Sequence, residues 1–97
     1  MTHEIVLKPS AVDDMDSLRK FDATRIADAI ERHLTHEPRK LSKSRIKRLR
    51  GFRNPDYRLR VGDYRVFYTV DDEARCVEVL RVLHKDKTLE YYEELDR

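Results

Sequence analysis

Apolar and charged residues alternate on both sides of a glycine in the second half of the chain, which is the pattern of a β-hairpin. The alternation runs from Tyr57 to Val61, Gly62 and Asp63 supply a two-residue turn, and the alternation resumes at Tyr64. Residues equidistant from such a turn lie opposite each other. The predicted register places Tyr57, Leu59, Val61, Tyr64, Val66 and Tyr68 on one face and Arg58, Arg60, Arg65 and Phe67 on the other.

The predicted register sets two arginines directly opposite each other, which is unfavourable unless something offsets the repulsion. An anion, a nearby carboxylate or solvent would make the Arg60 and Arg65 pair tolerable. Proteins keep such conflicts mostly at functional sites, and an arginine cluster is suited to phosphate. The alternative is that these positions are only the solvated outer face of a half-buried sheet.

The first third of the chain predicts one strand and two helices. A short, partly β-branched run from His3 to Lys8 suggests a strand that ends at Pro9. Ser10 is expected to cap a first helix, with Asp13 completing a capping box. Asp22 is expected to cap a second helix, which should stop before Pro38. The apolar stripe of this second helix consists of Ile26, Ala29, Ile30, His33 and Leu34.

The remainder of the chain, from Arg39 onwards, predicts further strands and a final helix. A basic loop begins at Arg39 and enters a strand over residues 46–52, and residues 54–56 form a turn before the hairpin. A third run, over residues 75–83, follows an acidic turn. Residues 88–95 fit a short helix with Thr88 as its cap.

These elements predict an α+β fold that forms one domain over residues 1–97. Its core is a small antiparallel sheet of three to four strands, with an N-terminal two-helix hairpin packed on one face and a short C-terminal helix. The arginine face of the sheet is expected to stay open, which makes it the candidate site.

Charge is distributed unevenly along the chain. The formal net charge is only +2, but residues 39–65 hold eleven Lys or Arg against two Asp. A basic band of this kind is typical of a nucleic-acid binder, although a charge-rich solvated surface is the alternative. Phosphate contacts are expected from Lys43, Arg45, Lys47, Arg48, Arg50 and Arg53, joined by Lys87.

The cysteine content and the hydropathy of the chain indicate the cellular compartment in which the protein is expected. The single cysteine, Cys76, excludes an internal disulfide and a zinc site built on a Cys pair, and is expected to be a strand residue. No apolar run reaches the length of a membrane span, and no secretory signal pattern begins the chain. A cytoplasmic protein is therefore expected.

Taken together, the motifs resemble those of the RelE/ParE superfamily of bacterial and archaeal toxins over nearly the whole chain. The most specific part is the Gly-x-Tyr-Arg-x-x-Tyr hairpin followed by a His-Lys strand end. The residues that carry the resemblance are Leu49-Arg50-Gly51, Tyr57-Arg-Leu-Arg60, Gly62-Asp-Tyr-Arg-Val-Phe-Tyr68, Val79-Leu-Arg-Val82, His84-Lys85 and Tyr91.

For the RelE branch, the resemblance implies an mRNA endonuclease that works in the ribosomal A site, needs no metal or other cofactor and is silenced by a cognate antitoxin. The ribose 2′-hydroxyl of the message attacks the neighbouring phosphorus, which leaves a 2′,3′-cyclic phosphate and a 5′-hydroxyl. This chemistry needs a proton acceptor, a group that neutralises the phosphorane and a proton donor for the leaving oxygen.

The resemblance also implies catalytic roles for six residues. Arg65 matches the arginine that holds the scissile phosphate. Arg58 and Arg60 occupy positions where RelE-like toxins often carry lysines; as arginines they stabilise negative charge but cannot accept a proton. His84 and Lys85 are candidates for proton transfer. Tyr91 matches a substrate-orienting tyrosine, with Tyr92 as the alternative.

Two other functions remain open. A ParE-like inhibitor of DNA gyrase shares the fold and has a similar strand end over residues 81–84, but lacks the cationic catalytic set. A non-catalytic nucleic-acid-binding module is the third interpretation.

Overall fold

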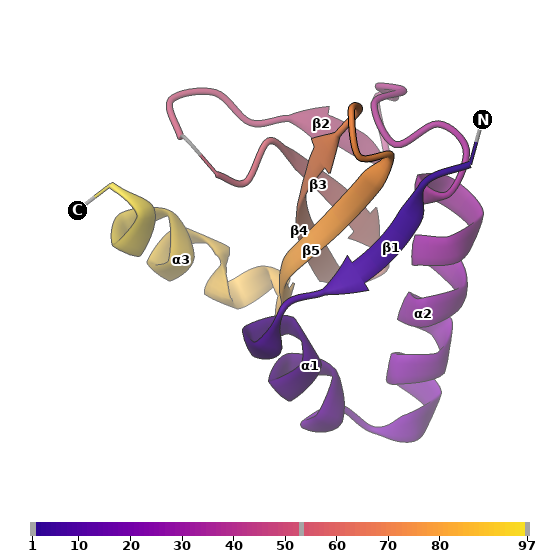
Figure 1. The fold of residues 1–97 in the computed structure, drawn as a ribbon. Helices are drawn as coiled ribbons and strands as arrows, with labels where there is room; N and C mark the ends of the chain where they lie inside the picture. Colours follow the sequence, from indigo (N-terminus) through magenta and orange to yellow (C-terminus); the bar gives the residue numbers. More distant parts are fainter. Residues whose placement is uncertain (1, 53, 97) are drawn as a thin grey trace.

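Five strands form one sheet that lies between helices on opposite sides (Figure 1). The structure is a computed structural model that describes residues 2–52 and 54–96. In chain order the elements are β1 (Glu4–Leu7), α1 (Pro9–Asp16), α2 (Lys20–Leu34), β2 (Ile46–Arg48), β3 (Tyr57–Val61), β4 (Tyr64–Asp71), β5 (Cys76–His84), a short 3₁₀ helix (Lys85–Lys87) and α3 (Thr88–Leu95). None of the helices in this described part is both long and apolar enough to cross a membrane.

The sheet confirms the α+β class but has one more strand than predicted, and it is mixed rather than antiparallel. The strand order is β1-β5-β4-β3-β2, and β1 pairs parallel to β5, with Glu4 opposite Cys76. No local pattern reveals this pairing, because its partners are about seventy residues apart and meet only when the core forms. Strand β2 is also shorter than expected, ending at Arg48.

The hairpin register matches the prediction at every position. Tyr57 lies opposite Tyr68, Arg60 opposite Arg65, and Val61 opposite Tyr64. Gly62 has φ of +58°, as the first central residue of a two-residue hairpin turn requires. The period of two therefore sends the three arginines to one face and the apolar residues to the other.

Helix α2 covers the apolar face of the sheet (Figure 1). Its buried stripe, Ile26, Ile30 and Leu34, belongs to the same core cluster as Leu59 and Val66 of the hairpin. Helix α1 instead packs against β5 and β1. The predicted stripe thus identifies the helix face that excludes water from the sheet.

Helix α1 also closes an open stretch of the edge of β5. Strand β1 pairs with β5 only as far as Val79. Beyond it, the Asp14 carboxylate accepts a hydrogen bond from the backbone N–H of Val82 at 2.9 Å and two from the Arg81 guanidinium at 2.8 and 2.9 Å. A side chain of α1 therefore satisfies a strand donor that would otherwise face the outside.

The three predicted helix caps are wrong. Helix α1 begins at Pro9 with Lys8 as its N-cap, so Ser10 lies inside the first turn. Helix α2 begins at Lys20, and the nearly buried Asp22 accepts a hydrogen bond from the Tyr64 hydroxyl instead. Thr88 is the first residue of α3, and its hydroxyl donates to the Lys85 carbonyl. The side chains of Asp22 and Thr88 thus make contacts other than the N-cap bonds that their sequence positions suggested.

The arginine face is open only over part of its area. Phe67, on the same face as Arg65, is fully buried because α3 covers it. The Phe67 ring lies 4.8 Å from the Tyr91 ring and 5.9 Å from the Tyr92 ring, measured between centroids. The expectation of a wholly exposed face is therefore corrected.

We expect Gly62→Ala to destabilise the fold by about 1–2 kcal/mol, because alanine at positive φ is strained. An added methyl would also displace the Arg25 guanidinium, which packs against Gly62. The matched control is Gly51→Ala, whose φ is +86° but where an added methyl meets open space. Chemical denaturation measures both variants. A smaller loss for Gly62→Ala than for Gly51→Ala would contradict the role of this contact.

Candidate nucleic-acid interface

Cationic side chains from three neighbouring strands and the preceding loop converge on one shallow cavity. It has a volume of about 130 Å³ and lies on the arginine face of the hairpin. We call it the arginine cavity. The residues that line it are Lys43, Ser44, Arg45, Lys47, Arg58, Arg60 and Arg65.

Strand pairing explains the convergence. Arg58 and Arg60 are alternate residues of β3, Arg65 lies opposite Arg60 on β4, and Lys47 lies opposite Arg58 on β2. Because side chains of paired residues point to the same face, all four extend towards the cavity. Such a concentration of positive charge is suited to a phosphate group.

Arg65 is held in a fixed orientation by the backbone of its own hairpin. Its Nη1 donates to the carbonyls of Gly62 at 3.0 Å and Tyr64 at 2.9 Å. Burial lowers the pKa of Arg65, and the charges of Arg58 and Arg60 lower it further. An arginine nevertheless stays protonated in proteins. The shift thus reflects burial first and crowding of positive charge second, and an incoming anion would relieve the crowding.

Tyr92, rather than Tyr91, reaches the arginines. The Tyr92 hydroxyl accepts a hydrogen bond from Arg58 Nη1 at 3.1 Å, and its ring stacks on Phe52 with centroids 5.4 Å apart. Tyr91 is buried against Phe67 and Arg81, and burial raises its pKa to about 12. The geometry therefore favours the alternative tyrosine that the sequence left open.

His84 and Lys85 lie outside the arginine cavity. His84 pairs with Tyr64, and its ring meets the Tyr64 ring edge-on at 5.5 Å, so it lies on the α2 side of the sheet. Its Nδ1 accepts the backbone N–H of Asp86 at 3.1 Å. Lys85 forms an ion pair with Asp63 at the hairpin tip, with 3.6 Å between Nζ and Oδ1.

The residues expected to bind phosphate separate into groups. Lys43, Arg45 and Lys47 line the arginine cavity. Arg48 lies over the Tyr57 ring on the opposite face, and together with Arg50 it lines a separate hollow in the β2–β3 connection. Lys87 lies between β5 and α3 beside Glu90. Arg53 lies outside the described residues.

Sequence reasoning missed two features of the site. Ser44 is a cavity residue in a loop without a recognisable pattern. The contact between Arg58 and Tyr92 joins positions 34 residues apart. For the contact between Arg58 and Tyr92, the sequence carried one signal, the helical periodicity of α3. This periodicity places the buried Tyr91 and its neighbour Tyr92 on different sides of the helix.

Comparison with known protein families identifies a match over most of the chain. A family model described as the ParE toxin of the type II toxin–antitoxin system parDE matches residues 5–89. A search of curated proteins finds no match.

Solved structures with the same fold include several toxin structures. The RelBE2 toxin–antitoxin complex from Mycobacterium tuberculosis is 26% identical with a TM-score of 0.71, and the match covers 87% of this chain and 99% of that one. The archaeal RelE–RelB complex from Pyrococcus horikoshii is 29% identical with a TM-score of 0.71, covering 88% and 97%. The isolated RelE toxin of E. coli, 22% identical with a TM-score of 0.69 and covering 98% and 97%, supports the fold alone.

The family model spans most of the chain, and the strand order, the hairpin and the terminal helix form one consistent architecture. The chain therefore belongs to the ParE toxin family of type II toxin–antitoxin systems, within the RelE/ParE superfamily.

Proposed function

We propose that this toxin is a ribosome-dependent mRNA endonuclease of the RelE type, held inactive by a cognate antitoxin. The observation that carries the proposal is the arginine cavity, in which Arg58, Arg60 and Arg65 share one hollow of about 130 Å³. Three guanidinium groups around one position provide the charge and the directed N–H donors that a pentacoordinate phosphorane needs.

In the proposed reaction, the 2′-oxygen of the message forms a bond to the adjacent phosphorus as the bond from phosphorus to the 5′-oxygen breaks. The 2′-proton goes to a base, and the leaving 5′-oxygen gains a proton. Arg65 holds the scissile phosphate because its guanidinium is already fixed by the Gly62 and Tyr64 carbonyls. Arg58 and Arg60 neutralise the charge that develops on phosphorus, and Tyr92 orients Arg58.

Lys47 is the proposed proton acceptor. Arginine cannot lose its proton in a protein, whereas the amine of lysine can be neutral. Lys47 is fixed on β2 directly opposite Arg58 and lines the same cavity. The leaving oxygen takes its proton from Lys85, which lies outside the cavity but is held by Asp63 in the same turn whose Gly62 carbonyl fixes Arg65. His84 has no part in this scheme, because its ring packs against Tyr64 on the other face.

We expect Lys47→Arg to reduce message cleavage about 100-fold, since the variant keeps the charge but removes the base. Lys43→Arg is the matched control, because Lys43 lines the same cavity from the loop. Single-turnover cleavage of ribosome-bound message compares the rates of the two variants with that of the wild type. Equal rates for the two variants would exclude Lys47 as the base.

The proposed partners are an antitoxin, the ribosome and its message. The Mycobacterium tuberculosis and Pyrococcus horikoshii structures are complexes of a toxin with an antitoxin. The basic loop and β2 offer an acidic antitoxin segment the same charges that they offer RNA, so one surface accounts for both classes of partner. Binding of an antitoxin there would exclude the message.

Two observations favour a second function, inhibition of DNA gyrase without nuclease activity. The family model that matches the chain is the one described for the ParE toxin. In addition, arginines occupy positions 58 and 60, which leaves proton transfer to residues elsewhere.

Mapping of RNA 5′ ends after induction of the toxin in growing cells separates the two functions. The proposal expects new ends within translated codons, at positions that correspond to the ribosomal A site, and 5′-hydroxyl termini. Intact messages together with gyrase-linked double-strand breaks would select the gyrase inhibitor instead. Co-expression of the antitoxin should suppress either outcome.

A further inference from the structure

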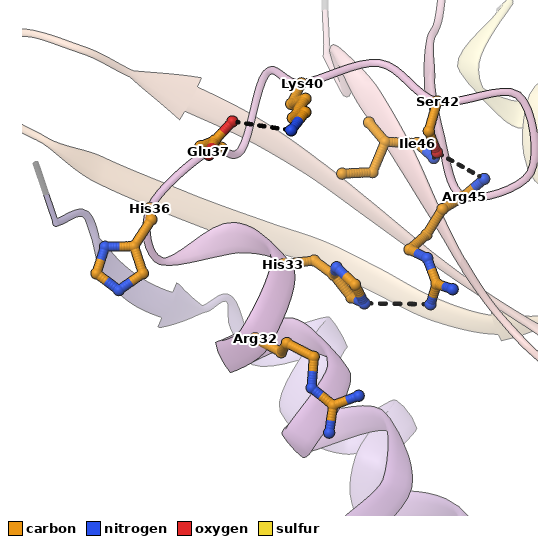
Figure 2. A pocket seen from close by; sticks show the side chains of 8 residues that line it. All are labelled: Arg32, His33, His36, Glu37, Lys40, Ser42, Arg45 and Ile46. Carbon is orange, nitrogen blue, oxygen red and sulfur yellow. Dashed lines mark hydrogen bonds and ion pairs between the residues drawn. The ribbon is translucent and has the colours of Figure 1, made fainter.

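A second and larger cavity lies at the carboxyl end of α2, beside the edge of the sheet (Figure 2). Its volume is about 400 Å³. Helix α2 contributes Arg32 and His33, the segment that follows contributes His36 and Lys40, and Arg45 closes the side towards β2. We call it the α2 cavity.

The net charge of the groups around the α2 cavity is positive. Glu37 is paired with Lys40, with 3.6 Å between the carboxylate oxygen and Nζ, so these two largely cancel. The carboxyl end of a helix contributes roughly half a negative charge. Arg32 and Arg45 each carry a full positive charge and therefore outweigh the helix end. The cavity favours an anion.

Arg45 connects the two cavities, since it lines both. It immediately precedes the edge strand β2, and its carbonyl accepts the backbone N–H of Arg60 at 2.8 Å. Its Nη1 donates to His33 Nε2 at 3.1 Å (Figure 2). The side chain thus passes from the arginine cavity to α2, and a polyanion that follows it meets positive charge throughout.

We propose that the α2 cavity is a second phosphodiester subsite, which holds the nucleic-acid strand at a phosphate distant from the one in the arginine cavity. Arg45 lies between the two subsites, and Arg32 is the principal charge of the second. This inference rests on the proposed function, because it extends the same bound strand. It assigns to α2 a role in binding that the catalytic scheme does not use.

The hydrogen bond between Arg45 and His33 gives the subsite a spectroscopic readout. An arginine only donates hydrogen bonds, so Nε2 of His33 accepts and the ring is neutral. Burial and the charges of Arg45 and Arg32 lower the pKa of His33 in the free protein. A phosphate that binds Arg45 would release Nε2 and favour the protonated ring. The His33 resonances should then titrate at higher pH when the strand is bound.

Continuity favours a nucleic-acid strand over an acidic peptide. The arginine cavity and the α2 cavity have Arg45 in common, so a chain with one charge at each repeat has a cationic partner where it passes from one cavity to the other. Side-chain carboxylates of a peptide have no such fixed spacing. The acidic peptide is therefore an alternative outcome of the test.

The test compares binding of a deoxydinucleotide and a deoxyhexanucleotide to the purified toxin at about 0.1 M salt. DNA lacks the 2′-hydroxyl, so binding is read without cleavage. We expect the longer strand to bind more tightly, and Arg32→Glu to weaken its binding about tenfold while leaving the dinucleotide unchanged. The salt dependence of hexanucleotide binding should also fall, by about 0.7 in slope for each phosphate that the variant no longer neutralises.

Lys20→Glu is the matched control for Arg32→Glu. It makes the same charge reversal on an exposed position of the same helix, about 18 Å from Arg32 by helix rise. That separation exceeds the Debye length of about 10 Å at 0.1 M salt. Binding of both oligonucleotides should stay within about twofold of the wild type.

Each outcome of the binding test either supports or overturns the second subsite. Equal binding of the two oligonucleotides, or an unchanged hexanucleotide affinity in Arg32→Glu, would overturn the subsite. Failure of both oligonucleotides to bind would overturn it as well. So would an effect of Arg32→Glu that is seen only on the binding of a poly-glutamate peptide, because that result would assign the cavity to an acidic partner. None of these binding results depends on message cleavage, which is measured separately by mapping RNA ends. Absence of those ends in the wild type would refute the proposed function alone.

Discussion

Replacement of Arg65 by alanine should lower message cleavage about 1,000-fold or more and relieve the growth arrest that the toxin causes. An arginine that stabilises a phosphoryl transition state contributes a factor of this size. Arg65 is the one arginine of the cavity that lies on β4, and backbone carbonyls of the hairpin fix its guanidinium. Single-turnover cleavage on programmed ribosomes measures the loss.

Two controls separate catalysis from folding and from charge. Arg65→Lys keeps the charge but loses the planar fork, so it should recover only a small part of the activity. Arg19→Ala removes an exposed arginine outside the sheet and should leave cleavage unchanged. Wild-type cleavage by a folded Arg65→Ala protein would rule out the arginine cavity as the active site.

Phe67→Ala should destabilise the fold by about 3–5 kcal/mol, the range found when a buried phenylalanine is truncated. Phe67 is fully buried between the sheet and α3, and it contacts both tyrosines of that helix. Loss of its ring leaves a cavity and removes the main apolar contact of α3. Urea unfolding followed by circular dichroism measures the change.

Phe67→Leu is the control for Phe67→Ala, because it keeps most of the side-chain volume and should cost less than about 1.5 kcal/mol. The larger truncation should also disturb the site, since Tyr92 would lose the support that brings its hydroxyl to Arg58. A loss under about 1 kcal/mol for Phe67→Ala would mean that α3 contributes little to stability.

The hairpin and α2 were predictable because their signals are local. A period of two on either side of a two-residue turn fixes the register of β3 and β4, and with it the shared face of Arg58, Arg60 and Arg65. The parallel pairing of β1 with β5 was not predictable, because it depends on contacts between the two ends of the chain. The predicted cap at Asp22 was wrong because a tertiary partner, the Tyr64 hydroxyl, binds its side chain.

The candidate site was predictable only as far as the hairpin extends. The side of the sheet that His84 occupies depends on how β5 pairs with β4, and that register contains an irregularity between Phe67 and Tyr68. Nothing in a single sequence reveals such a shift. The same limit applies to Tyr92, whose partner Arg58 lies on a strand far away in sequence.

The hydrogen bond from Val82 to Asp14 has a consequence for the behaviour of the protein in concentrated solution. An uncovered strand edge can recruit a strand from a second molecule and begin aggregation. Asp14 and Arg81 occupy this stretch of β5, and the other border of the sheet, β2, is three residues long with exposed Lys47 and Arg48. The exposed stretch of β5 and the β2 border thus both discourage intermolecular β-pairing, so the toxin should have little tendency to associate through these two stretches.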